Sequence, residues 1–119
     1  MPGLYPPVTI ADRRYIDGGF RSGTSADLAH GAKSVLIVAP IGRGNKGTAA
    51  LTRQLDGEIA EVEAAGGKVL LIEPDAASLE AFGPNLMDPD RRAVAADAGV
   101  RQGQAIAAEA RKLWTAVPA

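Results

Sequence analysis

The chain has 119 residues, with no cysteine and a single histidine. Without cysteine it can form neither a disulfide framework nor a zinc site built from thiolates. One histidine also excludes a histidine-rich metal site. The sequence therefore predicts no metal site, and we expect no cofactor.

Strong charge of one sign and long apolar runs are also missing. Thirteen lysines and arginines face 14 acidic residues, for a net charge of -1, so no basic surface is available for nucleic acid. No apolar stretch approaches the roughly 20 residues that span a bilayer, and the N-terminal residues lack the basic and apolar regions of a signal peptide. We expect one small domain at most, located in the cytoplasm, with no nucleic-acid partner and no transmembrane segment.

Short elements are predicted near the N-terminus. Two β-prone runs, residues 8–10 and 14–16, favour a tight hairpin or a bent strand pair. Thr24 and Asp27 match a weak capping box, which predicts a short helix ending at a glycine. That helix spans residues 25–30.

A strand, a helix and a second strand are predicted next. Residues 33–39 contain the continuous apolar run Val35-Leu36-Ile37-Val38, which is typical of a strand buried in a parallel sheet, and residues 68–73 repeat the pattern. Between them, apolar residues recur at helical spacing, and most acidic side chains, Glu58 included, are expected on the opposite face. The pattern indicates a βαβ unit, and hence an α/β fold with helices flanking a mainly parallel sheet.

Two further helices are predicted after this unit, over residues 76–82 and 90–115. The second contains Gly99 and Gly103, which weaken a helix interior by about 1 kcal/mol each unless a neighbour packs closely there. We expect this helix to pack closely on the sheet.

One short stretch, Tyr15-Ile16-Asp17-Gly18-Gly19, is the strongest functional signal. By itself it fits a strand that ends in a glycine turn, with Asp17 as a turn-capping carboxylate. It also fits a reactive carboxylate at a strand end, because Gly18 and Gly19 allow a sharp turn and the close approach of a reactant.

Together with residues 2–8, 26–29 and 35–40, in the same order, this stretch resembles the C-terminal part of bacterial patatin-like phospholipases. The resemblance implies a three-layer α/β fold with a mainly parallel sheet. Residues 1–119 would be the C-terminal part of one patatin-like domain, and thus a truncated domain. Those enzymes degrade lipids by acyl-ester hydrolysis, in the cytoplasm or at a membrane surface, so a lipid or ester substrate is implied.

The family's catalytic dyad pairs a serine in a Gly-x-Ser-x-Gly elbow with the aspartate of an Asp-Gly-Gly loop. The match implies that Asp17 is the catalytic base and that Gly18 and Gly19 support its loop. The nearest counterpart of the elbow, Gly23 to Asp27, lacks the final glycine and follows no buried strand. We therefore expect the chain to be inactive alone, and its unpaired sheet edge to favour self-association.

Two other functions stay open. Gly42, Gly44 and Gly47 form a G-x-G-x-x-G pattern after a predicted strand, with Glu73 placed as the acidic ribose ligand of a dinucleotide site. However, two residues separate the strand from the first glycine, and Glu73 lies farther along the chain than the usual spacing of about 20 residues. The other possibility is a non-catalytic interaction module.

Overall fold

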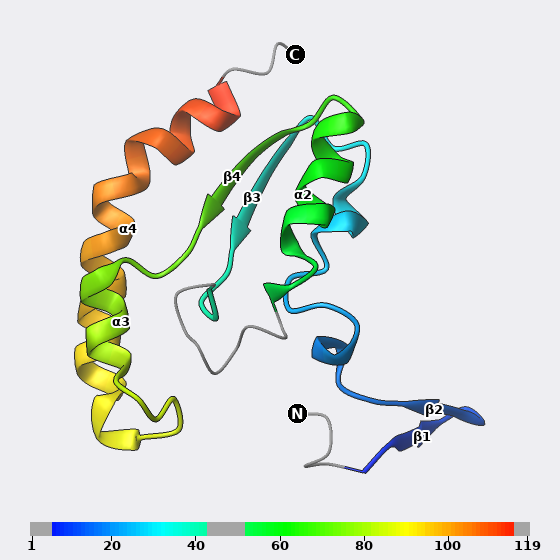
Figure 1. The fold of residues 1–119 in the computed structure, drawn as a ribbon, viewed down its shortest axis with the longest axis horizontal. Helices are drawn as coiled ribbons and strands as arrows, with labels where there is room; N and C mark the ends of the chain where they lie inside the picture. The colour runs from blue at the N-terminus through cyan, green and yellow to red at the C-terminus, as the bar shows by residue number, and fades with distance from the viewer. Residues whose placement is uncertain (1–5, 43–51, 116–119) are drawn as a thin grey trace.

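The computed structural model describes residues 6–42 and 52–115, and its mixture of helices and strands is broadly α/β (Figure 1). Its elements are β1 (Val8–Ile10), β2 (Arg13–Tyr15), η1 (Gly18–Phe20), η2 (Ala26–Ala29), β3 (Ser34–Val38), α2 (Leu55–Ala64), β4 (Lys68–Ile72), α3 (Ala76–Phe82), η4 (Pro89–Arg91) and α4 (Arg92–Thr115), where η marks a 3₁₀ helix.

The predicted hairpin is confirmed. Strand β1 pairs antiparallel with β2, and Val8 lies opposite Tyr15. The turn residues Ala11 and Asp12 have φ angles of 46° and 63°, which are the values of a turn whose twist matches that of the strands. The second strand begins one residue earlier than the sequence pattern indicated.

The predicted βαβ unit is also confirmed. Strands β3 and β4 pair in parallel, with Ser34 opposite Lys68 and Val38 opposite Ile72, and α2 connects them. The helix ends at Ala64, and Gly66, just after the C-cap residue Ala65, has a left-handed φ of 87°. Gly67 must also be glycine, because an added Cβ would lie 2.7 Å from the carbonyl oxygen of Ala32.

The two faces of this strand pair contact different helices, and α2 and α4 lie on opposite sides of it in Figure 1. On the α2 side, Ile37 and Leu55 are buried together. On the α4 side, the hydroxyl of Ser34 donates to the carbonyl of Leu113 at 3.0 Å. The main cluster consists of Ala26, Val35, Ile37, Ala39, Leu55, Ile59, Val69 and Leu71.

The C-terminal helices follow the sequence pattern closely. Helix α3 begins after Asp75, whose side chain accepts from the backbone N–H of Ser78 at 2.7 Å. Helix α4 packs against β3 and β4 as expected, but not closely at Gly99 and Gly103, where an added Cβ would meet nothing within 4 Å. Both glycines instead line a pocket of about 280 Å³. Among the described helices, none is long and apolar enough to cross a membrane.

Candidate functional site

Asp17 sits at the start of η1, directly after the hairpin. Its side-chain Oδ1 accepts a hydrogen bond from the backbone N–H of Gly19 at 2.8 Å, and its carbonyl accepts from the N–H of Phe20 at 3.1 Å. A Cβ on Gly19 would lie 3.2 Å from Oδ1, so the turn favours glycine there. Gly18 has open space around it. The three predicted site residues thus form one capped turn.

The carboxyl group of Asp17 is exposed and ionised at neutral pH. The hydrogen bond from the backbone N–H of Gly19 lowers the pKa of Asp17 below its usual value. A carboxylate that acts as a base needs the opposite environment, because partial desolvation raises its pKa. The described residues hold this side chain in place and leave it in solvent.

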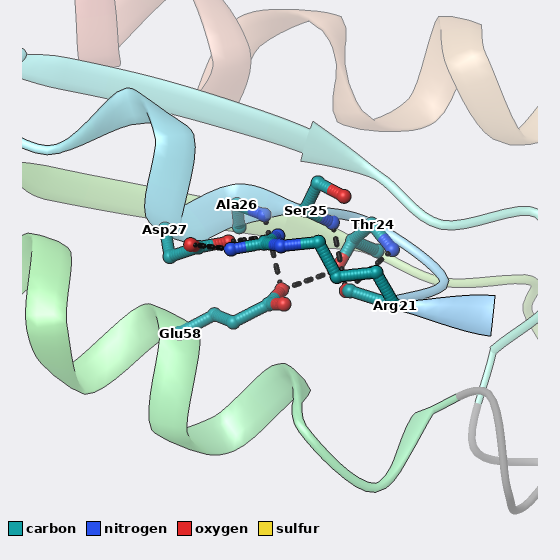
Figure 2. A network of polar contacts seen from close by, with 7 residues as sticks. Arg21, Thr24, Ser25, Ala26, Asp27 and Glu58 are labelled. Atoms are coloured by element: carbon teal, nitrogen blue, oxygen red, sulfur yellow. Dashed lines mark hydrogen bonds and ion pairs between the residues drawn. The ribbon is translucent and has the colours of Figure 1, made fainter. Parts of the chain in front are cut away.

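The segment that follows this turn is anchored to α2 by Glu58 (Figure 2). Glu58 is only 7% exposed, and its Oε2 accepts from the Thr24 hydroxyl at 2.7 Å and from the Ala26 N–H at 3.0 Å. The expectation that Glu58 faces away from the apolar stripe is wrong. It lies three residues after Leu55 and four before Val62, both fully buried, so its position is on the buried face.

Two serines in the same segment have structural roles. The Ser22 hydroxyl oxygen accepts from the N–H groups of Thr24 and Ser25, at 3.1 and 2.8 Å. Ser25 precedes η2 with a left-handed φ of 50°. An activated serine needs a strained turn between a strand and a helix. In this structure Ser22 instead holds the loop together, and Ser25 begins a 3₁₀ helix.

Arg21 and Asp27 close the loop from the other side. The guanidinium binds both carboxylate oxygens of Asp27, with Nη1 and Oδ1 at 3.0 Å. The hydrogen bond to Arg21 and the charge of its guanidinium lower the pKa of Asp27, and the hydrogen bond and negative charge of Asp27 raise the pKa of Arg21. The predicted capping box is therefore wrong, because Thr24 binds Glu58 and Asp27 binds Arg21. Both partners lie outside the residues that the capping pattern covers.

This anchored loop reaches the carboxyl end of β3. Gly23 and Thr24 share a cavity of about 80 Å³ with Ala39, Pro40 and other residues that follow the strand. In open α/β sheets, ligands bind outside the carboxyl ends of the strands. The chain thus brings the segment after Asp17 to the edge of the sheet where such sites are found.

A second group of polar residues lies beyond the ends of β3 and β4. Gln102 accepts from the Ser78 hydroxyl at 2.9 Å and donates to the Glu73 carbonyl at 2.7 Å. A Cβ on Gly42 would lie 3.0 Å from both Cβ and Oε1 of Glu73. The first glycine of the G-x-G-x-x-G pattern and its acidic residue are therefore neighbours. Gly44 and Gly47 lie outside the described residues.

Within residues 6–42 and 52–115, no group of three or more histidine, cysteine or acidic side chains could hold a metal ion. Sequence reasoning singled out Asp17 as a candidate and placed Glu58 on the wrong face of its helix, because the two donors to Glu58 come from a loop 34 and 32 residues away. Comparison with protein-family models, with curated proteins and with solved structures finds no match to this chain.

Proposed function

We propose that this chain contributes the catalytic aspartate, Asp17, to a patatin-like lipid acyl hydrolase with a serine–aspartate dyad. In this proposal the chain is the C-terminal part of a three-layer domain with a mainly parallel sheet. One observation carries it. The turn that holds Asp17 leads into a loop that Glu58 fixes to α2 and that borders the carboxyl end of β3. Substrates of α/β enzymes bind outside the carboxyl ends of the strands, and Asp17 lies in the turn directly before this loop, which supports the proposal.

The chemistry requires a serine hydroxyl as nucleophile. Its oxygen attacks the ester carbonyl while Asp17 takes the hydroxyl proton, and that proton then passes to the leaving alcohol. Water hydrolyses the acyl-enzyme in a second step, with Asp17 again as base. General-base help of this kind contributes about 10²- to 10⁴-fold, and oxyanion donors contribute a separate part of the acceleration.

The serine must come from a polypeptide segment outside residues 1–119. Ser22 is buried and already accepts two backbone N–H groups. The proposal therefore includes inactivity of the chain alone. Its substrate class, a lipid ester, is favoured by Ile16 and Phe20, which flank the Asp17 turn with 59% and 70% of their surface exposed. The proposed location is the cytoplasm or the surface of a membrane.

The test compares two products of the gene on a chromogenic ester, namely this chain and a longer product that includes the coding sequence before Met1. We expect no turnover from the chain and turnover from the longer product. Asp17→Asn should then lower kcat by about 10²-fold or more, because the base is lost while the size of the side chain is kept. The matched control is Asp12→Asn, an exposed residue of the neighbouring hairpin turn, which should leave kcat unchanged.

Three results would overturn the proposal. The first is turnover by the purified chain that disappears with Asp17→Asn, and the second is normal turnover by a folded Asp17→Asn form of the longer product. The third is a longer product with no serine elbow. Each contradicts a different part of the proposal, respectively the need for an outside serine, the role of Asp17, and the family resemblance.

A dinucleotide site remains a second candidate because of the contact between Gly42 and Glu73. In such sites, the acidic residue at the end of one strand lies near the glycine turn that follows another. Titration of the chain with NADH, followed by the cofactor's fluorescence, tests it directly. Saturable binding that is lost in Glu73→Gln and kept in the exposed Glu80→Gln would support this candidate, and no saturable binding would remove it.

A further inference from the structure

The chain exposes more surface than a compact protein of its size. Its accessible surface is 8521 Å² for a mass of 12.2 kDa, whereas monomeric proteins of this mass expose about 6,100 Å². Its radius of gyration is 16.5 Å, against about 13.5 Å for a globular chain of this length. The excess of about 2,400 Å² is of the size that one subunit buries in a large, permanent interface. Part of the exposed surface of this chain is therefore available for an interface with another polypeptide.

The outer edge of β3 is a specific place for that interface. The N–H of Ala39 donates to the carbonyl of Ile72, and the carbonyl of Lys33 accepts from the N–H of Lys68. The backbone groups of these odd-numbered residues therefore point toward β4. Because direction alternates along a strand, the N–H and C=O groups of the even-numbered residues point to the opposite edge. Those residues are Ser34, Leu36 and Val38, and no other described strand pairs with them.

An open groove runs beside β3. Its volume is about 400 Å³, and it lies between the loop that contains Gly23 to Ala29 and the strand residues Val35 to Val38. At one end, Val38 is 62% exposed. In β4, by contrast, all four apolar residues are half-buried. The open groove and the exposed apolar residue both lie on β3, which makes it the better candidate for strand pairing.

We propose that this edge binds the same edge of a second copy of the chain. The two β3 strands pair antiparallel about a two-fold axis at Leu36 and form one continuous sheet in the order β4–β3–β3–β4. Ser34 of one copy then faces Val38 of the other, and the three outward-facing residues supply about six backbone hydrogen bonds. Lys33 lies opposite Ala39, so no like charges meet. The contact is self-complementary, as a two-fold dimer requires.

The inference does not rest on the proposed hydrolase function, because it uses the surface and the backbone direction alone. The first test is sedimentation equilibrium of the full chain and of two matched proline variants. Leu36→Pro removes one outward N–H from β3, and Leu71→Pro removes one from the outer edge of β4. We expect the wild type and Leu71→Pro to have twice the mass of 12.2 kDa, and Leu36→Pro to be monomeric with its circular dichroism retained.

A second test does not depend on whether the proline variants fold. The chain has no cysteine, so Leu36→Cys introduces a single thiol at the proposed axis. In a directly opposed pair the two Cα atoms lie about 5.5 Å apart, within disulfide range. Mild oxidation should link the two copies covalently, whereas the control Leu71→Cys should stay unlinked.

Four outcomes would overturn the proposal. These are a wild type that stays monomeric at hundreds of micromolar, a dimer that a folded Leu36→Pro variant retains, a dimer lost only in Leu71→Pro, and rapid linking only in Leu71→Cys. The last two would move the interface to β4. None of these results bears on whether Asp17 acts as a base, so failure here and failure of the proposed function are distinguishable.

Discussion

Replacing Glu58 with alanine should destabilise the protein more than any other single acidic substitution on α2. The change removes the acceptor of two hydrogen bonds, from the Thr24 hydroxyl and the Ala26 N–H. A hydrogen bond to a charged group contributes about 1.5–3 kcal/mol, and a buried donor left without a partner costs about 1–3 kcal/mol. The Thr24 hydroxyl can rotate toward water, but the Ala26 N–H is fixed by the backbone. We therefore expect the free energy of unfolding to fall by about 2–4 kcal/mol.

The assay is urea denaturation followed by circular dichroism, together with the melting temperature. For a protein of this size, a loss of that magnitude should lower Tm by about 10 °C or more. Glu58→Gln keeps an oxygen acceptor and should lose less than half as much. The matched control is Glu61→Ala, which removes an exposed carboxylate from the same helix and should change the free energy of unfolding by no more than about 0.5 kcal/mol.

The same variants should differ locally. Amide hydrogen exchange at Ala26 should accelerate in Glu58→Ala and stay unchanged in Glu61→Ala, because only the first variant releases that N–H. Equal stability of Glu58→Ala and Glu61→Ala would refute the reasoning, since it would mean that the loop is not held by this carboxylate. Equal loss in Glu58→Gln and Glu58→Ala would show that the negative charge, rather than the acceptor geometry, stabilises the loop.

Further predictions concern the stability of two glycine variants and the loss of stability at low pH. Gly103→Ala should raise the free energy of unfolding, measured by urea denaturation, by up to about 1 kcal/mol, because the added Cβ meets nothing within 4 Å and alanine favours a helix. Gly67→Ala should lower the free energy of unfolding, because its Cβ would lie 2.7 Å from the Ala32 carbonyl oxygen. The ion pair with Arg21 lowers the pKa of Asp27, so its stabilising effect is present above the unfolded value of about 3.9 and is lost as pH falls through the folded pKa. Melting temperatures measured from pH 6 to pH 2 should therefore fall less steeply in Asp27→Asn than in the wild type, and equal slopes would contradict this.

The βαβ unit could be predicted because its signals are local and agree with one another. Continuous apolar runs predict buried strands, and the helical spacing between them and the glycines after α2 indicate the connecting helix. The hairpin was equally local. The 3₁₀ helices were predicted less well, since such short elements depend on contacts that no local pattern contains.

Glu58 shows why part of the site could not be predicted. A glutamate in an amphipathic helix is ordinarily assigned to the solvent side, because burying a carboxylate without partners is costly. Here the partners are the hydroxyl of Thr24 and the N–H of Ala26, which lie 34 and 32 residues away in the sequence. Helical spacing puts Glu58 on the same face of α2 as Leu55 and Val62. Nothing in the neighbouring sequence, however, indicates that a distant loop supplies two hydrogen-bond donors to its carboxylate. Arg21 and Asp27 are only six residues apart, but they are brought together by an irregular loop, which no helix or strand spacing predicts.

The environment of Asp17 connects the chemistry of the proposed site with the surface around it. A carboxylate can act as a base near neutral pH only if part of its surface is removed from water, which raises its pKa. In the described structure the opposite holds, since the carboxylate is exposed and its pKa is lowered. The side chains beside it, Ile16 and Phe20, are large, apolar and mostly exposed, so any surface that covers the turn gains free energy by burying them. In the proposed hydrolase, a single covering surface would therefore bury these apolar side chains and desolvate the Asp17 carboxylate together.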